Sequence, residues 1–357
     1  MLKIKSIKIK KIPNIYKGNK IYGNTSSSII NIKTNIKEIE GYGETYLSVY
    51  VPDIVKFIIN SFVKNLVGKN PLKIEKILSE LKIPFVSHNG LIKGLTAGIE
   101  IALWDIKSKF LKKPLFKLLN NKYYKNVKCY ASSGALKLNH NQIVKDVKST
   151  KMDGFNAYKM RIGKSNWEKD LKRVISAKKT LNRDFLMVDA IMGSHTRKWT
   201  FKEAIRKIKI LSKFKLTWIE EPLDPFNHSN YSKIKKKTKV KIAFGEQFTT
   251  SEEFISVIKN NCSDYIQPDI TMIGYIDAKK IIPHVKKSRK KIALHVWGSP
   301  ISLLSNLHFA LAFKEVEWIE IPYTNFNQLS KKLNNNIEIK NGKVRFKSKK
   351  FFGLGFK

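Results

Sequence analysis

The segment AYKMRIG, residues 157–163, carries two cationic side chains, Lys159 and Arg161, in an otherwise apolar run. The run is typical of a buried strand, and side chains two positions apart on a strand point to the same face. A buried strand does not normally direct two positive charges at one place without an anion to receive them. The pair therefore predicts a site for an anionic partner. One of its members, an arginine, does not readily release a proton.

Three carboxylates stand at the ends of later predicted strands. They are Asp189 in FLMVDA, Glu220 in WIEEP and Glu246 in AFGEQ. In a parallel barrel the C-terminal ends of consecutive strands lie side by side, where three carboxylates would repel one another without a cation. Ligands that offer only oxygen select a hard ion such as Mg²⁺. The pattern predicts one Mg²⁺ site made by Asp189, Glu220 and Glu246.

The same pattern continues along the chain with Asp269 in YIQPD, His295 in KIALH and Glu320 in EWIE. On adjacent strands Asp269 and His295 can form a pair in which the carboxylate orients the imidazole and supports its protonated form, as a general base requires. Glu221 follows Glu220 directly, so by strand alternation it should face away and act as a structural partner.

These side chains can lie close together only if their strands all end at one rim. The chain from Val127 onward alternates short apolar strands with helical stretches, as such an arrangement needs. Eight such units predict a closed parallel barrel. An open doubly wound sheet is the alternative, but no Gly-rich phosphate loop follows any strand. Several connecting helices should begin with capping boxes, formed by Ser165 with Glu168, Thr200 with Glu203 and Thr250 with Glu253.

The first part of the chain reads differently, as an antiparallel meander followed by helices over residues 52–66, 71–81 and 96–110. The tail, with IEIKNGKVRF, reads as strand and turn. The predicted organisation is an α+β domain over residues 1–126, a barrel over residues 127–327, and a segment over residues 328–357 that returns to the first domain.

Composition narrows the class of protein further. The chain has 357 residues with 69 Lys+Arg against 28 Asp+Glu, a net charge of +41. Such a charge can indicate nucleic-acid binding. However, the lysines are spread along the whole chain, and no zinc finger, aromatic RNA-binding signature or basic tail accompanies them, so a nucleic-acid partner is not expected. No apolar run is long enough to span a membrane. Two unpaired cysteines, Cys129 and Cys262, suit the cytoplasm.

In combination, these motifs resemble the enolase superfamily, within it the mandelate racemase and muconate lactonizing enzyme branch. The resemblance covers nearly the whole chain and rests on GYGET, IEIALWDIKSKFLKKPLFKLL, AYKMRIG, MVDA, IEEP, GEQ, QPDIT, HVWGS, WIEIP and FGLGF. It implies a (β/α)7β barrel with an α+β capping domain. It also implies that Asp189, Glu220 and Glu246 hold Mg²⁺, and that the catalytic ring comprises Lys159, Arg161, Asp269, His295 and Glu320. Two departures are Ile191, where the family usually has asparagine, and Phe352, where proline is common.

The family's common reaction removes a proton next to a carboxylate, and Mg²⁺ stabilises the enediolate that forms. Related enzymes often carry a second lysine as a base where this chain has Arg161, whose pKa is far too high for that task. With His295 as the one competent base, we expect Mg²⁺-dependent β-elimination of water from a sugar acid, an aldonate or aldarate. Sugar-lactone cycloisomerisation and racemisation or epimerisation remain alternatives, as does acid–base work by Arg161.

Substrate contacts are expected from a polar N-terminal loop and from the HVWGS strand end, at Tyr16, Tyr22, Lys159 and Trp297. A polar loop suits a hydroxylated acid better than an aromatic ligand. A homo-oligomer is also expected. An alternative of a different class is a polyanion-binding protein whose barrel has lost its catalytic activity. The net charge of +41 supports this alternative. The ring residues argue against it, because all of them could still take part in catalysis.

Overall fold

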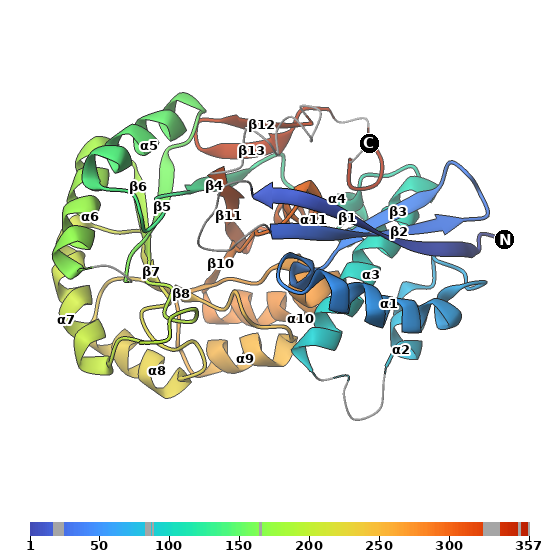
Figure 1. Ribbon diagram of the computed structural model, residues 1–357, viewed down its shortest axis with the longest axis horizontal. Coiled ribbons are helices and arrows are strands. Elements are labelled where there is room, and N and C mark those ends of the chain that lie inside the picture. Colours follow the sequence, from blue (N-terminus) through green and yellow to red (C-terminus); the bar gives the residue numbers. More distant parts are fainter. Residues whose placement is uncertain are drawn as a thin grey trace.

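The barrel strands begin at Val127 and run parallel around a closed ring in the computed structural model (Figure 1). The structure describes residues 1–16, 25–82, 87, 89–163, 166–323, 336–348 and 351–355. Each barrel strand pairs with the next, and the last pairs with the first through Glu320 and Tyr130 among others. The strands are β4 (Val127–Ser132), β5 (Ala157–Arg161), β6 (Phe185–Asp189), β7 (Trp218–Glu220), β8 (Ile242–Phe244), β9 (Tyr265–Ile266), β10 (Lys291–Leu294) and β11 (Val316–Pro322).

Helices join consecutive strands and cover the outside of the barrel (Figure 1). They are α5 (His140–Met152), α6 (Trp167–Leu181), α7 (Phe201–Leu211), α8 (His228–Lys237), α9 (Ser251–Lys259), α10 (Ile270–Ser288) and α11 (Pro300–Ala312), with the short 3-10 helix η2 (Ser212–Phe214) after α7. The order confirms the predicted (β/α)7β barrel. Among the described helices, none combines the length and apolar character that a membrane span needs.

Two of the predicted capping boxes start helices as expected, those of Thr200 at α7 and Thr250 at α9. The third differs, because Asn166 caps α6 by accepting a hydrogen bond from the backbone N–H of Glu168. Ser165 lies outside the described residues. An asparagine accepts the same hydrogen bond as a serine at this position, so either residue could be the cap on sequence grounds alone.

One inward-facing side chain from every strand fills the barrel below its C-terminal rim. Three alanines stand among five larger side chains around this layer, so that the side chains interdigitate and leave a packed core rather than a pore. The layer consists of Tyr130, Ala157, Met187, Trp218, Ala243, Tyr265, Ala293 and Trp318.

The N-terminal domain is a three-stranded antiparallel sheet packed on helices, with its own apolar core. It contains β1 (Ile4–Tyr16), β2 (Thr25–Thr34), β3 (Glu40–Glu44), the 3-10 helix η1 (Tyr46–Val49), α1 (Pro52–Leu66), α2 (Ile74–Glu80), α3 (Gly90–Phe110) and α4 (Leu115–Leu119). Helix α3 starts well before the predicted residue 96, because the side chain of Asn89 caps it at the backbone N–H of Leu91.

The C-terminal hairpin consists of β12 (Ile337–Lys340) and β13 (Lys343–Phe346). It extends the barrel sheet at the N-terminal end of β4, where Val344 pairs with Val127. The last described turn then reaches the N-terminal domain. There the backbone N–H of Gly353 donates to Ser108 (2.8 Å) and that of Leu354 to Asp105 (2.7 Å). The segment predicted to return to the first domain thus contacts both the barrel and that domain.

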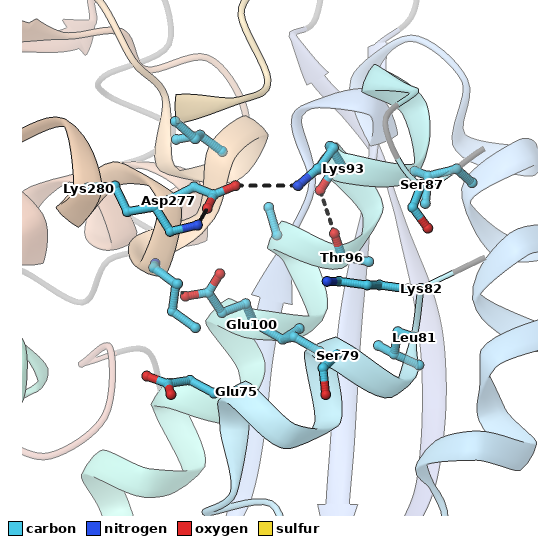
Figure 2. A pocket seen from close by; sticks show the side chains of 15 residues that line it. Glu75, Ser79, Leu81, Lys82, Ser87, Lys93, Thr96, Glu100, Asp277 and Lys280 are labelled. Carbon is cyan, nitrogen blue, oxygen red and sulfur yellow. Dashed lines mark hydrogen bonds and ion pairs between the residues drawn. The ribbon is translucent and has the colours of Figure 1, made fainter. Parts of the chain in front are cut away.

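The two domains are joined along α3 and α10 (Figure 2). Gly274 breaks α10 with φ of 74° and ψ of 170°. The carboxylate of Glu100 accepts from the backbone N–H of Ile276 (2.9 Å) in the resumed helix and from Trp104 Nε1 (3.1 Å). A barrel helix is therefore capped by a side chain of the N-terminal domain. Burial raises the pKa of Glu100 to about 8. A cavity of about 370 Å³ lies at this junction.

Candidate active site

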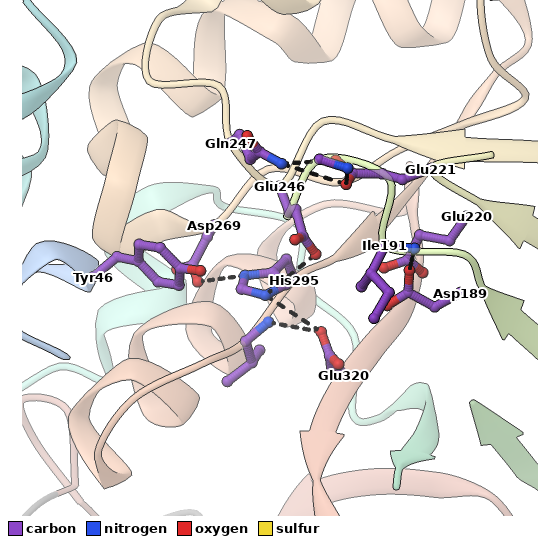
Figure 3. A network of polar contacts seen from close by, with 12 residues as sticks. Tyr46, Asp189, Ile191, Glu220, Glu221, Glu246, Gln247, Asp269, His295 and Glu320 are labelled. Carbon is purple, nitrogen blue, oxygen red and sulfur yellow. Dashed lines mark hydrogen bonds and ion pairs between the residues drawn. The ribbon is translucent and has the colours of Figure 1, made fainter. Parts of the chain in front are cut away.

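The predicted metal ligands and catalytic residues meet at the C-terminal rim of the barrel (Figure 3). The register explains this arrangement: Ala157, Met187, Trp218, Ala293 and Trp318 belong to the interior layer. The residue two positions after each of them therefore also points inward, one level nearer the rim. Those residues are Lys159, Asp189, Glu220, His295 and Glu320, all of them buried.

Lys159 lies at the centre of the carboxylates. Its Nζ atom is 2.7 Å from Glu220 Oε1, 3.1 Å from Glu320 Oε1 and 3.8 Å from Asp189 Oδ2. Burial alone lowers the pKa of Lys159, but Glu220 and Glu320 outweigh it and raise the pKa well above that of an ordinary lysine. The ammonium group is therefore charged and compensates carboxylates that would otherwise repel one another.

The three predicted metal ligands carry raised pKa values. Burial is the largest cause for each of them. Mutual repulsion adds to it, from Glu246 at Asp189 (raised to about 6), from Asp189 at Glu220 and from Glu220 at Glu246. Lys159 opposes the shift at Asp189 and Glu220, whereas His295 opposes it at Glu246.

This donor set fits a hard divalent cation, since it offers only carboxylate oxygens and such an ion would offset the repulsion that raises their pKa values. As they stand, no three acidic, histidine or cysteine side chains in the described ranges are grouped so that they could hold an ion. Lys159 and His295 supply the positive charge between the carboxylates.

The predicted histidine–aspartate pair is formed. His295 Nδ1 is 2.9 Å from Asp269 Oδ2, and this leaves Nε2 directed toward Glu246 (3.6 Å) and Glu320 (3.9 Å). Burial alone would lower the pKa of His295, but Glu246, the bond to Asp269 and Glu320 together raise it to about 9. Burial alone would raise the pKa of Glu320, but Lys159 and His295 outweigh it and lower the pKa to about 2.

Asp269 is fixed by residues that sequence reasoning missed. Its Oδ1 atom accepts from the Thr271 backbone N–H (2.8 Å), the Thr271 hydroxyl (2.7 Å) and Asn306 Nδ2 (3.0 Å). Thr271 follows in the QPDIT motif, whereas Asn306 comes from α11 and no local signal identifies it. With Oδ1 held in this way, Oδ2 is directed at the imidazole of His295.

The N-terminal domain also supplies a residue to the site. The ring of Tyr46 in η1 packs edge-on against His295, with ring centroids 5.5 Å apart (Figure 3). The Tyr46 hydroxyl lies 3.0 Å from that of Tyr50. Burial is the main reason that the pKa of Tyr46 is raised well above its ordinary value. Tyr46 directly follows the GYGET motif, so this motif could have indicated from the sequence that Tyr46 belongs to the site.

Arg161 is half-buried, points to the same side as Lys159, and donates from Nη1 to the Ser133 carbonyl (3.2 Å). Its guanidinium carbon lies 5.6 Å from the ring centroid of Trp297, a predicted substrate contact. The structure therefore brings Arg161 and Trp297 together. Tyr16 ends β1, but its side chain, like all of Tyr22, lies outside what the structure describes.

Two residues beside the predicted ligands have left-handed backbone conformations, Ile191 with φ of 45° and Glu221 with φ of 40°. A β-branched residue rarely adopts positive φ, whereas asparagine tolerates it. The positive φ therefore suits the family's asparagine, and nothing in the structure explains the isoleucine. Glu221 turns away from the ring as predicted and is held by the backbone N–H of Gly193 (3.2 Å) and by Gln247 Nε2 (3.3 Å).

A closed (β/α)7β barrel, an α+β domain that reaches its rim, and a buried ring of carboxylates around a lysine and a histidine–aspartate pair define a class of barrel enzymes with a capping domain. The chain belongs to the mandelate racemase and muconate lactonizing enzyme branch of the enolase superfamily. Residues 142–357 match the family described as "Enolase C-terminal domain-like". Residues 20–120 match "Mandelate racemase / muconate lactonizing enzyme, N-terminal domain". The predicted family is therefore confirmed.

Named relatives include L-talarate/galactarate dehydratase from Salmonella typhimurium, 31% identical over 297 residues, or 82% of this chain and 70% of that protein. D-galactarolactone cycloisomerase from Agrobacterium fabrum is 26% identical over 262 residues, or 71% of this chain and 68% of that protein. Among solved structures, L-talarate dehydratase from Polaromonas sp. JS666, complexed with Mg and L-glucarate, has a TM-score of 0.86 and 25% identity. That match covers 100% of this chain and 95% of the other.

Proposed function

We propose that the protein is a hydro-lyase that removes water from a sugar acid in a Mg²⁺-dependent reaction. The similarity to L-talarate/galactarate dehydratase supports the substrate class, and a related structure contains Mg and L-glucarate. Asp189, Glu220 and Glu246 would hold the metal ion. When bound, Mg²⁺ would stabilise negative charge on the substrate carboxylate.

The observation that carries this proposal is that the catalytic residues offer a base on one face of the substrate and an arginine on the other. His295, oriented by Asp269 at 2.9 Å, presents its Nε2 atom to the site, and its ordinary pKa lies near neutrality. A cation held at Glu246 would offset carboxylate charge that raises this pKa to about 9. Arg161 occupies the place where a second base would be needed, and its guanidinium stays protonated. A racemase needs proton transfer on both faces of the substrate, whereas a dehydratase needs one base.

The proposed reaction uses His295 twice. Its Nε2 atom takes the proton from the carbon next to the carboxylate, and the electron pair of that C–H bond enters the enediolate. The enediolate then expels the β-hydroxyl group, which leaves as water with the proton returned by the imidazolium of His295. Lys159 and Arg161 hold the substrate anion and the developing negative charge. The enol that remains tautomerises to a 2-keto-3-deoxy acid.

The test is a library of aldonates and aldarates incubated with the protein and Mg²⁺, with 2-keto acid measured as the product. We expect turnover of at least one acid, and none in excess chelator or with Asp189→Asn. The substrate separates the two activities: dehydration starts from the open-chain acid, whereas a cycloisomerase starts from the lactone, whose eliminative opening also gives a ketone. Spectra by ¹H NMR identify which of the two substrates is consumed. If no acid gives a 2-keto product while a sugar lactone is isomerised, cycloisomerase activity replaces this proposal.

A further inference from the structure

A second group of cationic and polar side chains lies outside the catalytic ring, around Lys207 of α7. Lys207 is 8% exposed, so most of its side chain is buried, while its ammonium group lines a cavity at the protein surface. The Nζ atom lies 3.9 Å from the ring centroid of Trp199 and 5.4 Å from that of Trp167. It forms neither a hydrogen bond nor an ion pair with any residue that the structure describes. A buried ammonium group without such a partner is costly, and two indole rings offset only part of that cost.

The two carboxylates nearest to Lys207 are committed elsewhere. Glu203 accepts from the Thr200 backbone N–H (2.8 Å) in the capping box of α7 and lies 3.4 Å from Arg197. Asp170 accepts from the Gly163 backbone N–H (2.9 Å) and from Arg173 (2.9 Å). Both carboxylates contribute to the charge around Lys207 without bonding to it. The lysine therefore retains donors that no described side chain uses.

These donors line a cavity of about 360 Å³. Lys207 and Trp199 form part of its wall, and Ser194, Thr196 and Arg197 contribute the polar loop at its mouth. No residue of the catalytic ring lines it. Two cations, Lys207 and Arg197, the hydroxyl group of Thr196 and a wall of aromatic carbon suit a small anion with several oxygen acceptors. Glu203 also lines the cavity, 3.4 Å from Arg197, and offsets part of the positive charge that the two cations offer to an anion.

We propose that this cavity binds a small oxyanion, a phosphate or a carboxylate, with the ammonium group of Lys207 as its principal donor. Arg197 and the hydroxyl group of Thr196 complete the contacts at the mouth, whereas the hydroxyl group of Ser194 donates to the Ile191 carbonyl (3.1 Å). The proposal does not depend on the proposed dehydratase activity, because the two sites share no residue.

The flanking tryptophans provide the measurement. Tryptophan emission is followed at constant ionic strength while inorganic phosphate is added, and in separate titrations while acetate or the uncharged acetamide is added. We expect a saturable change with an anion and none with acetamide. Saturation by phosphate alone assigns the site to phosphate, and saturation by acetate alone assigns it to carboxylates. The absence of a saturable change with either anion would overturn the proposal.

The matched variants are Lys207→Met and Lys209→Met, which remove a buried and an exposed lysine from the same helix. Loss of Lys207 should weaken anion binding about tenfold or more, since a charge-assisted bond is lost, whereas loss of Lys209 should leave it unchanged. Equal affinities in the two variants contradict the proposal. If Lys207→Met does not fold, the exposed pair Thr196→Val and Arg197→Gln is used instead. An unchanged affinity in that double variant has the same meaning.

Discussion

At the level of single residues, Arg161 separates one-base from two-base chemistry. If it only positions charge, Arg161→Lys should lower kcat/KM about 10- to 100-fold, because the planar group next to Trp297 and its bond to the Ser133 carbonyl are lost. It should open no new reaction. The measurement is deuterium exchange at the substrate carbon next to the carboxylate, followed by NMR in D₂O.

The same experiment on the unmodified protein provides the control. Exchange with retention of configuration agrees with a single base at His295. Incorporation of deuterium with inversion, or faster exchange in Arg161→Lys, would mean that a group on the second face transfers protons. The one-base dehydratase mechanism would then be wrong.

His295→Asn should abolish both exchange and turnover. The imidazole is the proposed base, and removing a general base costs about 10²- to 10⁴-fold in rate. Asparagine can still approach Asp269 but takes up no proton near neutral pH. Mg²⁺ binding, measured by calorimetry, should persist because Asp189, Glu220 and Glu246 are untouched. Residual exchange at the unmodified rate in His295→Asn would show that another group removes the proton.

The ring residues could be predicted from sequence because each depends on a local rule. A polar residue at the end of an apolar strand, two positions after an interior residue, must point inward at the rim. Asn306 and Tyr46 follow no such rule, since each meets its partner through a tertiary contact between distant elements. Contacts of this kind depend on how helices and domains pack, which a strand or helix pattern does not encode.

At the level of elements, β3 of the N-terminal domain holds the loop after β10 that contains Trp297. Glu44 at the end of β3 is fully buried, and its carboxylate accepts from the backbone N–H groups of Ser299 (3.0 Å) and Ser302 (3.1 Å) at the start of α11. The hydroxyl groups of Ser27 and Ser299 also donate to it. One carboxylate thus caps a barrel helix from the other domain.

Glu44→Gln should therefore destabilise the protein by about 2–4 kcal/mol, since charge-assisted bonds to buried donors are lost. Turnover should fall as well, because the loop that contains Trp297 loses its anchor. Unfolding in urea and kcat/KM are the measurements, and the exposed Glu38→Gln is the matched control. Equal stability of the two variants would show that the cap contributes little.

Element boundaries show where sequence rules stop. The predicted first helix, residues 52–66, agrees with α1 because Pro52 marks its start. The start of α3 was placed too late, since the cap at Asn89 follows a segment with no apolar period. The hairpin β12–β13 was read as strand and turn, but its pairing with β4 follows from the closure of the barrel sheet rather than from its own residues.

At the level of the whole molecule, the charge of +41 favours approach of an anionic substrate at low ionic strength. The cytoplasmic location, the homo-oligomer and the domain limits at residues 126 and 327 stay predictions. So does the expectation that nucleic acid is not a partner. A titration with duplex DNA over a range of salt concentrations tests that last point, because tight and steeply salt-dependent binding would favour the polyanion-binding alternative.

The N-terminal domain, the barrel and the C-terminal segment also meet around one histidine. The stability of this junction should therefore depend on pH. His308 of α11 is fully buried, accepts from the Phe116 backbone N–H (3.3 Å) of α4, and lies against Phe346 and Phe351 of the C-terminal segment. Burial lowers the pKa of His308 to about 3. Between that value and the ordinary value near 6.5, the unfolded chain takes up a proton that the folded protein does not.

Stability attributable to His308 is therefore fully present above about pH 6.5 and falls as the pH is lowered toward 3, by about 1.4 kcal/mol per pH unit. We expect a loss of about 2 kcal/mol from this group between pH 7 and pH 5, measured by urea unfolding. His308→Gln keeps an acceptor for Phe116 but takes up no proton, so its stability should depend less steeply on pH over this interval. The exposed His140→Gln should follow the unmodified protein. If all three lose stability in parallel below pH 6.5, His308 is not the group that couples the junction of the domains to acid.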